Sequence, residues 1–410
     1  MSREQLSPGA AKLLTGRNAA LVVIIGAVLI AGPSQAGAYW TRVLTSVAIY
    51  AIVAAGVALL YGRLGLVSLG QISLVGVGGW LTLRIGHATS LPFEVLLLLA
   101  AVGTAVIGVL VGLPALRLSG LNLAIVTLML AGAFEIVFTY LGFPNGGTGF
   151  RGRAEGGVLQ QPLPRPVLGG DDAAYFRYVV VAAVLCFALL AWHLRGRPGR
   201  AWAALRQSEA GALAAGVNTV GYRLWALALA SFVTGLAGGL LAGTTGFLDP
   251  ISFKASQSIL LFATVLIGGA FSLSGAVIAG LFFQGVPPLL DSFGLNGNLI
   301  FVLLGLGMIQ TIATAPKGIA GQLEGLARRL RRKPGPEPAS SAEPAEPAEP
   351  ADPAEPASPA EPAAGPPEPL PSPQAALETT AAREAGSTPG KAGAPETAGA
   401  PERVRKGHAE

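Results

Sequence analysis

The chain has 410 residues, of which 51% are hydrophobic and only 12% are charged, and its mean hydropathy is +0.57. A soluble domain carries about 25% charged residues, so this chain has too little polar surface to cover itself in water. The composition excludes a soluble protein and predicts an all-α, polytopic transmembrane bundle, because apolar runs of about 20 residues match the bilayer thickness.

The net charge of +5 combines two opposed parts of the chain. Residues 1–333 carry a net charge of +13, and residues 334–410 carry a net charge of −8. Excess Lys and Arg in the first part is typical of cytoplasmic loops of membrane proteins and does not indicate a nucleic-acid partner. The single cysteine, Cys186, excludes an internal disulfide and a metal site built on several thiolates.

Ten apolar segments are expected to cross the membrane. The first, near 19–32, follows a basic cytoplasmic N-terminus at 1–18; we expect an uncleaved span, with a cleaved signal peptide as the alternative. The short pair at 257–271 and 275–290 is compatible with one bent span, a re-entrant pair or two spans. The other segments fall near residues 42–61, 66–86, 91–113, 121–141, 176–194, 223–246 and 298–315.

The distribution of basic residues predicts the orientation. With the N-terminus inside, alternation places Arg63, Arg117 and the arginines between 195 and 206 in the cytoplasm. The basic run RRLRRK at 328–333 is also inside only if the number of spans is even, which favours ten. Both termini are then cytoplasmic.

The C-terminal part divides at two composition changes. The transmembrane domain is expected at 19–320, a basic juxtamembrane segment at 321–333, and a disordered tail rich in Pro, Ala and Glu at 334–410. The tail repeats AEPAEPAEP and has too few large apolar residues to form a core. We expect a solvated acidic tail, with a recognition segment as the alternative.

Polar residues within the spans are candidates for a translocation pathway. Glu135 in AGAFEIVFTY costs about 2.5–3.5 kcal/mol in its charged form at mid-membrane, so it must face protein or water. The glycine-rich segments permit broken helices that line a cavity, or close helix packing alone. The pathway candidates are Ser68, Gln71, Asn122, Thr127, Glu135, Gly268 and Gly269. The alternative role for the polar ones is hydrogen bonding between helices.

The sequence contains no motif for catalysis or for nucleotide binding. There is no GxxxxGK[ST] loop, no HExxH and no Cys/His cluster, so we expect no enzyme, no metal and no cofactor bound by this chain. Energy for any transport must come from a partner or from an ion gradient. A single intramembrane carboxylate gives little support to an ion-coupled carrier.

A polar stretch at 199–218, GRAWAALRQSEAGALAAGVN, interrupts the apolar chain. Pro198 before it and Gly216 near its end are typical of a helix. Trp202, Leu205 and Leu213 offer an apolar side, and Arg206, Gln207 and Glu209 offer polar groups. We expect this segment to dock onto a water-soluble motor; an amphipathic helix on the lipid headgroups is the alternative.

Over roughly residues 45–325 the chain resembles the permease subunit of ABC importers for branched-chain amino acids, of the LivM type. The blocks that carry the resemblance are YGRLGLVSLGQISLVGVGGWL (61–81), LRLSGLNLAIVTLMLAGAFEIVF (116–138) with NGGTGFRG (145–152), residues 199–253, and ILLFATVLIGGAFSLSGAVIAG (259–280). Gln71 stands where the family often has His, and Glu209 to Gly216 is one residue longer than the usual coupling box.

The resemblance implies partners and roles. It implies two ATPase subunits that use ATP and Mg²⁺, a LivH-type second permease subunit and an extracytoplasmic solute-binding protein. By the same resemblance, 199–218 is the cytoplasmic coupling segment, with coupling residues Arg200, Trp202, Leu205, Arg206, Glu209 and Gly216. A urea or short-amide importer of the same family, an ion-coupled carrier and a membrane scaffold remain alternatives.

Overall fold

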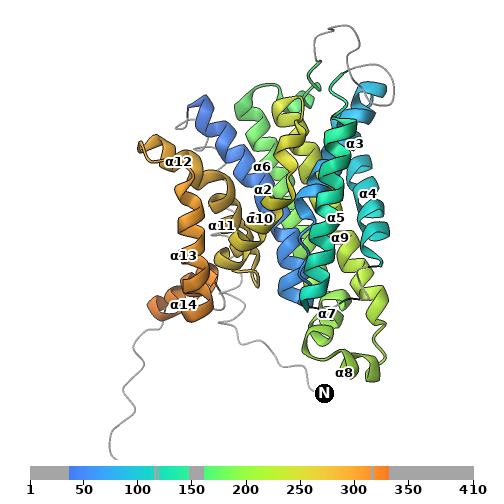
Figure 1. Ribbon diagram of the computed structural model, residues 1–410, viewed down its shortest axis with the longest axis vertical. Coiled ribbons are helices and arrows are strands. Elements are labelled where there is room, and N and C mark those ends of the chain that lie inside the picture. The colour runs from blue at the N-terminus through green and yellow to red at the C-terminus, as the bar shows by residue number, and fades with distance from the viewer. Residues whose placement is uncertain (1–36, 115–117, 119, 147–160, 315–317, 332–410) are drawn as a thin grey trace, which may run out of the picture. The chain divides into compact units, whose positions relative to one another are not determined.

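The computed structural model describes residues 37–331, with gaps at 115–117, 119, 147–160 and 315–317 (Figure 1). Within these residues all regular secondary structure is helical, which confirms the predicted all-α class. The expected first span at 19–32 and the expected tail lie outside the described residues.

The long helices are α2 (Ala38–Leu64), α3 (Gln71–Ala88), α4 (Phe93–Gly112), α5 (Gly120–Leu141), α6 (Asp172–Arg195), α9 (Thr219–Thr245) and α13 (Leu299–Thr314). The shorter helices are α7 (Arg197–Gln207), α8 (Glu209–Ala214), α10 (Ala255–Gly268), α11 (Leu273–Gly280), α12 (Val286–Ser292) and α14 (Gly318–Arg331). Between them lie the short helical turns η2 (Val167–Gly169), η3 (Pro250–Phe253) and the π-helical η4 (Leu281–Gly285).

Six of the described helical segments are long and apolar enough to cross a bilayer: α2, α4, α5, α6, α9 and the composite α11–η4–α12. They differ in burial. The most apolar windows of α2 and α9 are 72% and 61% buried within the chain, whereas those of the other four are only 28–33% buried. Helices α2 and α9 therefore form the centre, and the others expose leucine, valine and isoleucine side chains outward, as lipid-facing helices do.

Helix α3 is held in the centre by glycine contacts with α9. A Cβ atom at Gly78 would overlap the backbone of Gly235, and one at Gly238 would overlap the carbonyl of Val75. Because lipid offers no hydrophobic drive between helices, such close backbone approach gains van der Waals contact that larger residues prevent. Close helix packing, one of the two roles expected for the glycine-rich segments, is therefore the role of Gly78, Gly235 and Gly238.

Two passes through the bundle are only partly helical. Residues 65–70 are non-helical, so the expected span at 66–86 begins as a helix only at Gln71. Helix α10 has 14 residues, about 21 Å, and is too short to cross about 30 Å of hydrocarbon by itself. The segment 246–254 before it enters the bundle and completes the pass, and Ala255 N–H donates to Glu135 Oε2 of α5 over 2.8 Å.

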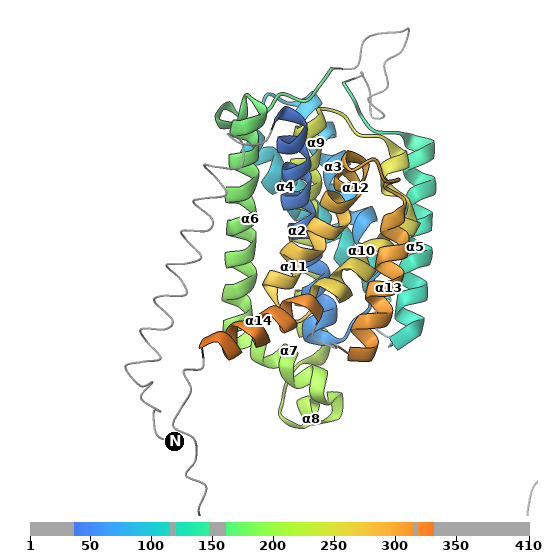
Figure 2. The same cartoon turned by 90° about the vertical axis from the view of Figure 1, so that its left-hand side faces the viewer.

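The two ends of the bundle carry different elements. Helices α7, α8 and α14 lie at the lower end in Figure 1, and Figure 2 shows the same grouping from a second direction. The described part of the chain begins at the upper end with α2, and α13 ends at the lower end, where α14 also lies. The expected pair at 257–271 and 275–290 forms two separate passes, and the expected domain boundary at 320 falls inside α14.

Candidate functional site

The expected coupling segment at 199–218 is two short helices and not one. Helix α7 ends at Gln207, and Ser208 has an extended backbone (φ −160°, ψ 121°). The Ser208 hydroxyl oxygen accepts the Gly211 N–H over 3.1 Å and so caps α8. Serine favours this position because its side chain competes with the helical backbone for hydrogen bonds, and the single-helix expectation overlooked that competition.

Helix α7 is anchored to its own chain. Trp202 is completely buried, and its Nε1–H donates to the carbonyl of Tyr222 in α9 over 2.9 Å. Leu205 is also buried. Burying one tryptophan removes about 150–250 Å² from water, worth about 4–6 kcal/mol, so α7 is firmly held against the bundle. Trp202 and Leu205 therefore face inward and do not form the exposed apolar side that their spacing suggested.

The charged residues of the segment also bind to the chain, with different strength. The Arg206 guanidinium donates to the carbonyl of Gly62 in α2 and lies 4.6 Å from the centre of the Phe271 ring. Glu209 forms an ion pair of 2.7 Å with Arg223 in α9, but the Glu209 side chain is 51% exposed. Such an exposed pair contributes less than about 1 kcal/mol, so Glu209 can readily exchange this partner for another.

The surface left for a partner lies mainly on α8. Leu213 of α8 is 56% exposed and gives the segment an apolar surface residue. Gly216 follows the helix with φ +77°, a conformation that favours glycine, and turns the chain into α9. Arg200 is exposed on the first half of α7. The segment thus combines a buried anchor on α7 with an exposed apolar residue on α8.

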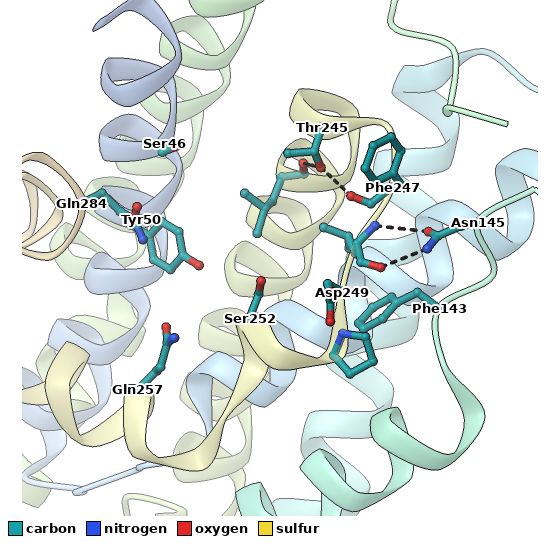
Figure 3. Close-up of a pocket in the computed structure, with 13 residues that line it drawn as sticks. Ser46, Tyr50, Phe143, Asn145, Thr245, Phe247, Asp249, Ser252, Gln257 and Gln284 are labelled. Carbon is teal, nitrogen blue, oxygen red and sulfur yellow. Dashed lines mark hydrogen bonds between the residues drawn. The ribbon is translucent and has the colours of Figure 1, made fainter. Parts of the chain in front are cut away.

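A cavity of about 630 Å³ opens in the upper half of the bundle (Figure 3). Its size falls in the range of roughly 300–1,000 Å³ that is typical of small-molecule sites. The lining side chains come from α2, α9, η4, α10 and the two segments that follow α5 and α9. They are Ser46, Tyr50, Phe143, Asn145, Leu241, Thr245, Phe247, Leu248, Asp249, Pro250, Ser252, Gln257 and Gln284.

The non-helical segment after α9 forms one wall of the cavity and is held by side-chain hydrogen bonds. Asn145 bonds the backbone of Leu248 in both directions, donating to its carbonyl over 3.0 Å and accepting its N–H over 3.1 Å (Figure 3). Thr245 donates to the carbonyl of Phe247 over 2.6 Å. These bonds replace the helical hydrogen bonds that this backbone lacks, as a membrane interior requires.

The lining is polar but carries little charge. Hydroxyl and amide groups of Ser46, Thr245, Ser252, Gln257 and Gln284 supply both donors and acceptors. Asp249 is the only carboxylate among the lining residues, and these residues include no Lys or Arg. Its Oδ1 accepts the N–H of Ile251 over 2.9 Å, and its other oxygen stays available to a solute. This combination suits a small solute with an amine or amide group.

None of the seven expected pathway residues lines this cavity. Glu135 instead binds the first N–H of α10, so protein satisfies the intramembrane carboxylate as expected. Gln71 is 1% exposed and accepts a 2.8 Å hydrogen bond from Thr234 of α9. Thr127 Oγ1 accepts the N–H of Leu69 over 3.0 Å. Glu135 and Gln71 link helices, which was the stated alternative, and Thr127 links α5 to the non-helical residues before α3.

The other expected pathway residues are scattered. Asn122 is exposed on α5, and Ser68 lies in the non-helical residues before α3. Gly268 ends α10, and Gly269 follows with φ 113° at the turn into α11, at the lower end. A role for these residues elsewhere along a pathway stays a prediction. The signal that was missed is GFLDPISF at 246–253, where Gly, Asp and Pro follow an apolar helix and break it inside the membrane.

The described residues contain no group of three or more His, Cys, Asp or Glu side chains that could hold a metal ion.

The model of one protein family, described as "Branched-chain amino acid transport system / permease component", matches residues 39–312, which include the cavity and helices α7 and α8.

Two curated relatives are similar over most of that region. Both are named high-affinity branched-chain amino acid transport system permease protein LivM. The chain is 29% identical to the protein from Salmonella typhimurium over 309 residues, which cover 67% of this chain and 68% of the relative. It is 29% identical to the protein from Escherichia coli over 305 residues, covering 66% of this chain and 67% of the relative. No solved structure matches the chain.

Proposed function

Because the chain belongs to the family of permease components of branched-chain amino acid transport systems, whose members are membrane subunits of ABC importers, we propose that its cavity is the passage for a branched-chain or other hydrophobic amino acid. The observation that carries this proposal is the composition of the cavity wall. Asp249 can pair with the ammonium group of a bound amino acid, and the neutral hydroxyl and amide groups of the wall can bind the carboxylate of that amino acid. Leu241, Phe143 and Phe247 provide apolar surface for the side chain.

The lower end is the cytoplasmic end in this proposal. Arg63, Arg195, Arg197, Arg200 and Arg206 all lie in or beside the elements at this end. An excess of basic residues on one side is typical of the cytoplasmic face, so the cavity in the upper half opens toward the outside. The orientation puts both termini in the cytoplasm of a bacterium with the chain in its plasma membrane.

Separate subunits supply the energy and the solute. Two ATPase subunits bind below the segment 199–218, a LivH-type permease completes the passage, and an extracytoplasmic solute-binding protein delivers the amino acid. ATP shifts the population of permease conformations because the ATPases bind one conformation better than another. No cofactor is bound by this chain.

Uptake by the reconstituted complex tests the substrate and the energy source. We expect proteoliposomes that contain the permease pair, the ATPases and the binding protein to accumulate labelled leucine only when ATP is present at the ATPase side. Urea remains the second candidate because the amides of Asn145, Gln257 and Gln284 can also bind it. Uptake of labelled urea without leucine would contradict the amino-acid proposal, and uptake without ATP would indicate an ion-coupled carrier.

Leu213 on α8 provides a test of the docking surface. A leucine that fills a partner's pocket contributes about 2 kcal/mol or more, so Leu213→Asp should weaken ATPase binding roughly thirtyfold. We expect the tagged permease to co-purify with much less ATPase while its own yield is unchanged.

Leu323→Asp is the matched control for Leu213→Asp. Leu323 is a leucine of α14 at the same end, outside the coupling segment, and its exposure is 54% compared with 56% for Leu213. Normal ATPase recovery with Leu213→Asp, or an equal loss with both variants, would contradict docking on α8.

A further inference from the structure

A single side chain connects the coupling segment to two different transmembrane elements. Arg206 of α7 reaches the last turn of α2 through the carbonyl of Gly62, and it reaches the turn between α10 and α11 through the ring of Phe271. The last carbonyls of a helix have no partner within the helix. Arg206 supplies a cationic donor to one of them from another helix, where positive charge also favours the helix dipole.

The two elements that Arg206 contacts are themselves packed closely together. A Cβ atom at Gly62 would overlap the carbonyl of Ala270, so the backbones touch. Arg63 donates to the carbonyl of Phe271 over 3.4 Å, and the Tyr61 and Phe271 ring centres are 6.4 Å apart. Because Gly62 has no side chain to separate the two backbones, and because the neighbouring side chains also connect them, we expect the end of α2 and the α10–α11 turn to move as one unit. We call this unit, with Arg206, the Arg206 junction.

The helices that meet at this junction line the cavity with their other parts. Helix α2 contributes Ser46 and Tyr50, α10 contributes Gln257, and η4, which continues from α11, contributes Gln284. Tyr50 and Gly62 are separated along α2 by about 18 Å at the helical rise. A rigid helix carries a displacement over that distance, so a shift at the junction alters the cavity wall.

We propose that Arg206 is a positioning residue that transmits movement of the coupling segment to α2 and to the α10–α11 turn, and through them to the cavity. The inference rests on the proposed function, in which ATPase subunits move the segment. Trp202 and Leu205 hold α7 to the bundle, whereas Arg206 makes the polar link from α7 to α2 and the turn. Without this link the ATPases still dock on α8, but their movement no longer reaches this side of the cavity.

The test uses the complete complex in proteoliposomes and three variants. Arg206→Ala removes both contacts. Arg206→Lys keeps a cation for the Gly62 carbonyl but loses the planar group that stacks on Phe271. Arg197→Ala is the matched control, since Arg197 is an exposed arginine of the same helix for which the described residues show no hydrogen bond or ion pair.

Three quantities are measured: ATP hydrolysis, leucine uptake and accessibility of the cavity. For the third, Ser252→Cys is introduced in a background in which the only cysteine, Cys186, is replaced by alanine. The rate at which an external, charged thiol reagent labels this cysteine is compared with and without ATP.

We expect Arg206→Ala to lower uptake by roughly 5- to 150-fold, the range of typical coupling free energies. ATP hydrolysis and complex yield should stay near those of the wild type, and the labelling rate should no longer respond to ATP. Arg206→Lys should give leucine uptake between that of Arg206→Ala and that of the wild type. Arg197→Ala should behave as the wild type in all three measurements.

Two results would overturn the proposal. One is normal uptake with a normal labelling response in Arg206→Ala. The other is a parallel fall of complex yield, ATP hydrolysis and leucine uptake in Arg206→Ala, since that pattern indicates that Arg206 only stabilises the fold. Failure of the proposed function is seen separately, because the wild-type complex would then transport without ATP.

Discussion

Replacing Gly238 by leucine is expected to abolish the folded protein. A Cβ atom at this position in α9 would overlap the carbonyl of Val75 and lie 2.8 Å from the amide nitrogen of Gly79, both backbone atoms of α3. Backbone atoms cannot rotate away as a flexible side chain does, so α3 and α9 must separate. Overpacking a core usually costs about 1–3 kcal/mol, and separating two central helices costs more, because every contact along their interface is lost. Against a total stability of about 5–15 kcal/mol, such a loss is decisive.

The measurement is the yield of monodisperse protein in detergent by size-exclusion chromatography, together with its thermal midpoint. Gly132→Leu is the matched control, because Gly132 lies within α5 and a Cβ atom there would meet no neighbouring atom within 4 Å. We expect the control to keep its yield. Equal behaviour of the two variants would show that close contact between α3 and α9 does not hold the bundle together.

Ser252→Trp should eliminate most transport while leaving the fold intact. Ser252 lies on η3, and its side chain points into the cavity among Tyr50, Gln257 and Asp249 (Figure 3). The residue is exposed and its backbone is outside the long helices, so a larger side chain enters open space and does not press on packed helices. An indole in this position excludes solute from the polar wall. We expect leucine uptake to fall by more than about tenfold, equivalent to about 1.4 kcal/mol.

The neighbouring residue gives the control for Ser252→Trp. Ile251 belongs to the same turn, is 66% exposed and is absent from the cavity wall. Ile251→Trp therefore introduces the same bulk at the adjacent position of the backbone without occupying the cavity. ATP hydrolysis and protein yield should match the wild type in both variants. Transport that survives in Ser252→Trp would mean that solute crosses the chain by another route.

Several features could be read from the sequence because they depend on neighbours along the chain. Apolar runs of bilayer length predict membrane helices, and the polar stretch at 199–218 stands out by contrast. The break at Ser208 is also local, since a serine followed by Glu209 and a helix is a capping pattern, yet the helical spacing on both sides concealed it. Glu135 was expected to face protein or water, and its partner, the N–H of Ala255, is 120 residues away.

The cavity could not be found in the same way. Ser46, Asn145, Thr245, Gln257 and Gln284 are polar residues of ordinary type, separated by up to 238 positions. They meet only because α9 and α10 both pack against α2, and because the chain leaves α9 at 246–254 and returns into the bundle. Most of the expected pathway residues were selected for being polar within spans, and two of them, Gln71 and Glu135, use that polarity to join helices.

By itself the sequence determined the class of the protein, the approximate position of its membrane helices and the location of the polar segment at 199–218. These properties follow from hydropathy, charge and length, which each segment carries whatever it packs against. The tertiary structure alone decided which side chains surround the cavity and which face of α7 is buried. Those outcomes depend on contacts between helices that are distant in the chain. A glycine, which has no Cβ atom, allows two helix backbones to touch, but no local sequence pattern specifies which helix is the partner.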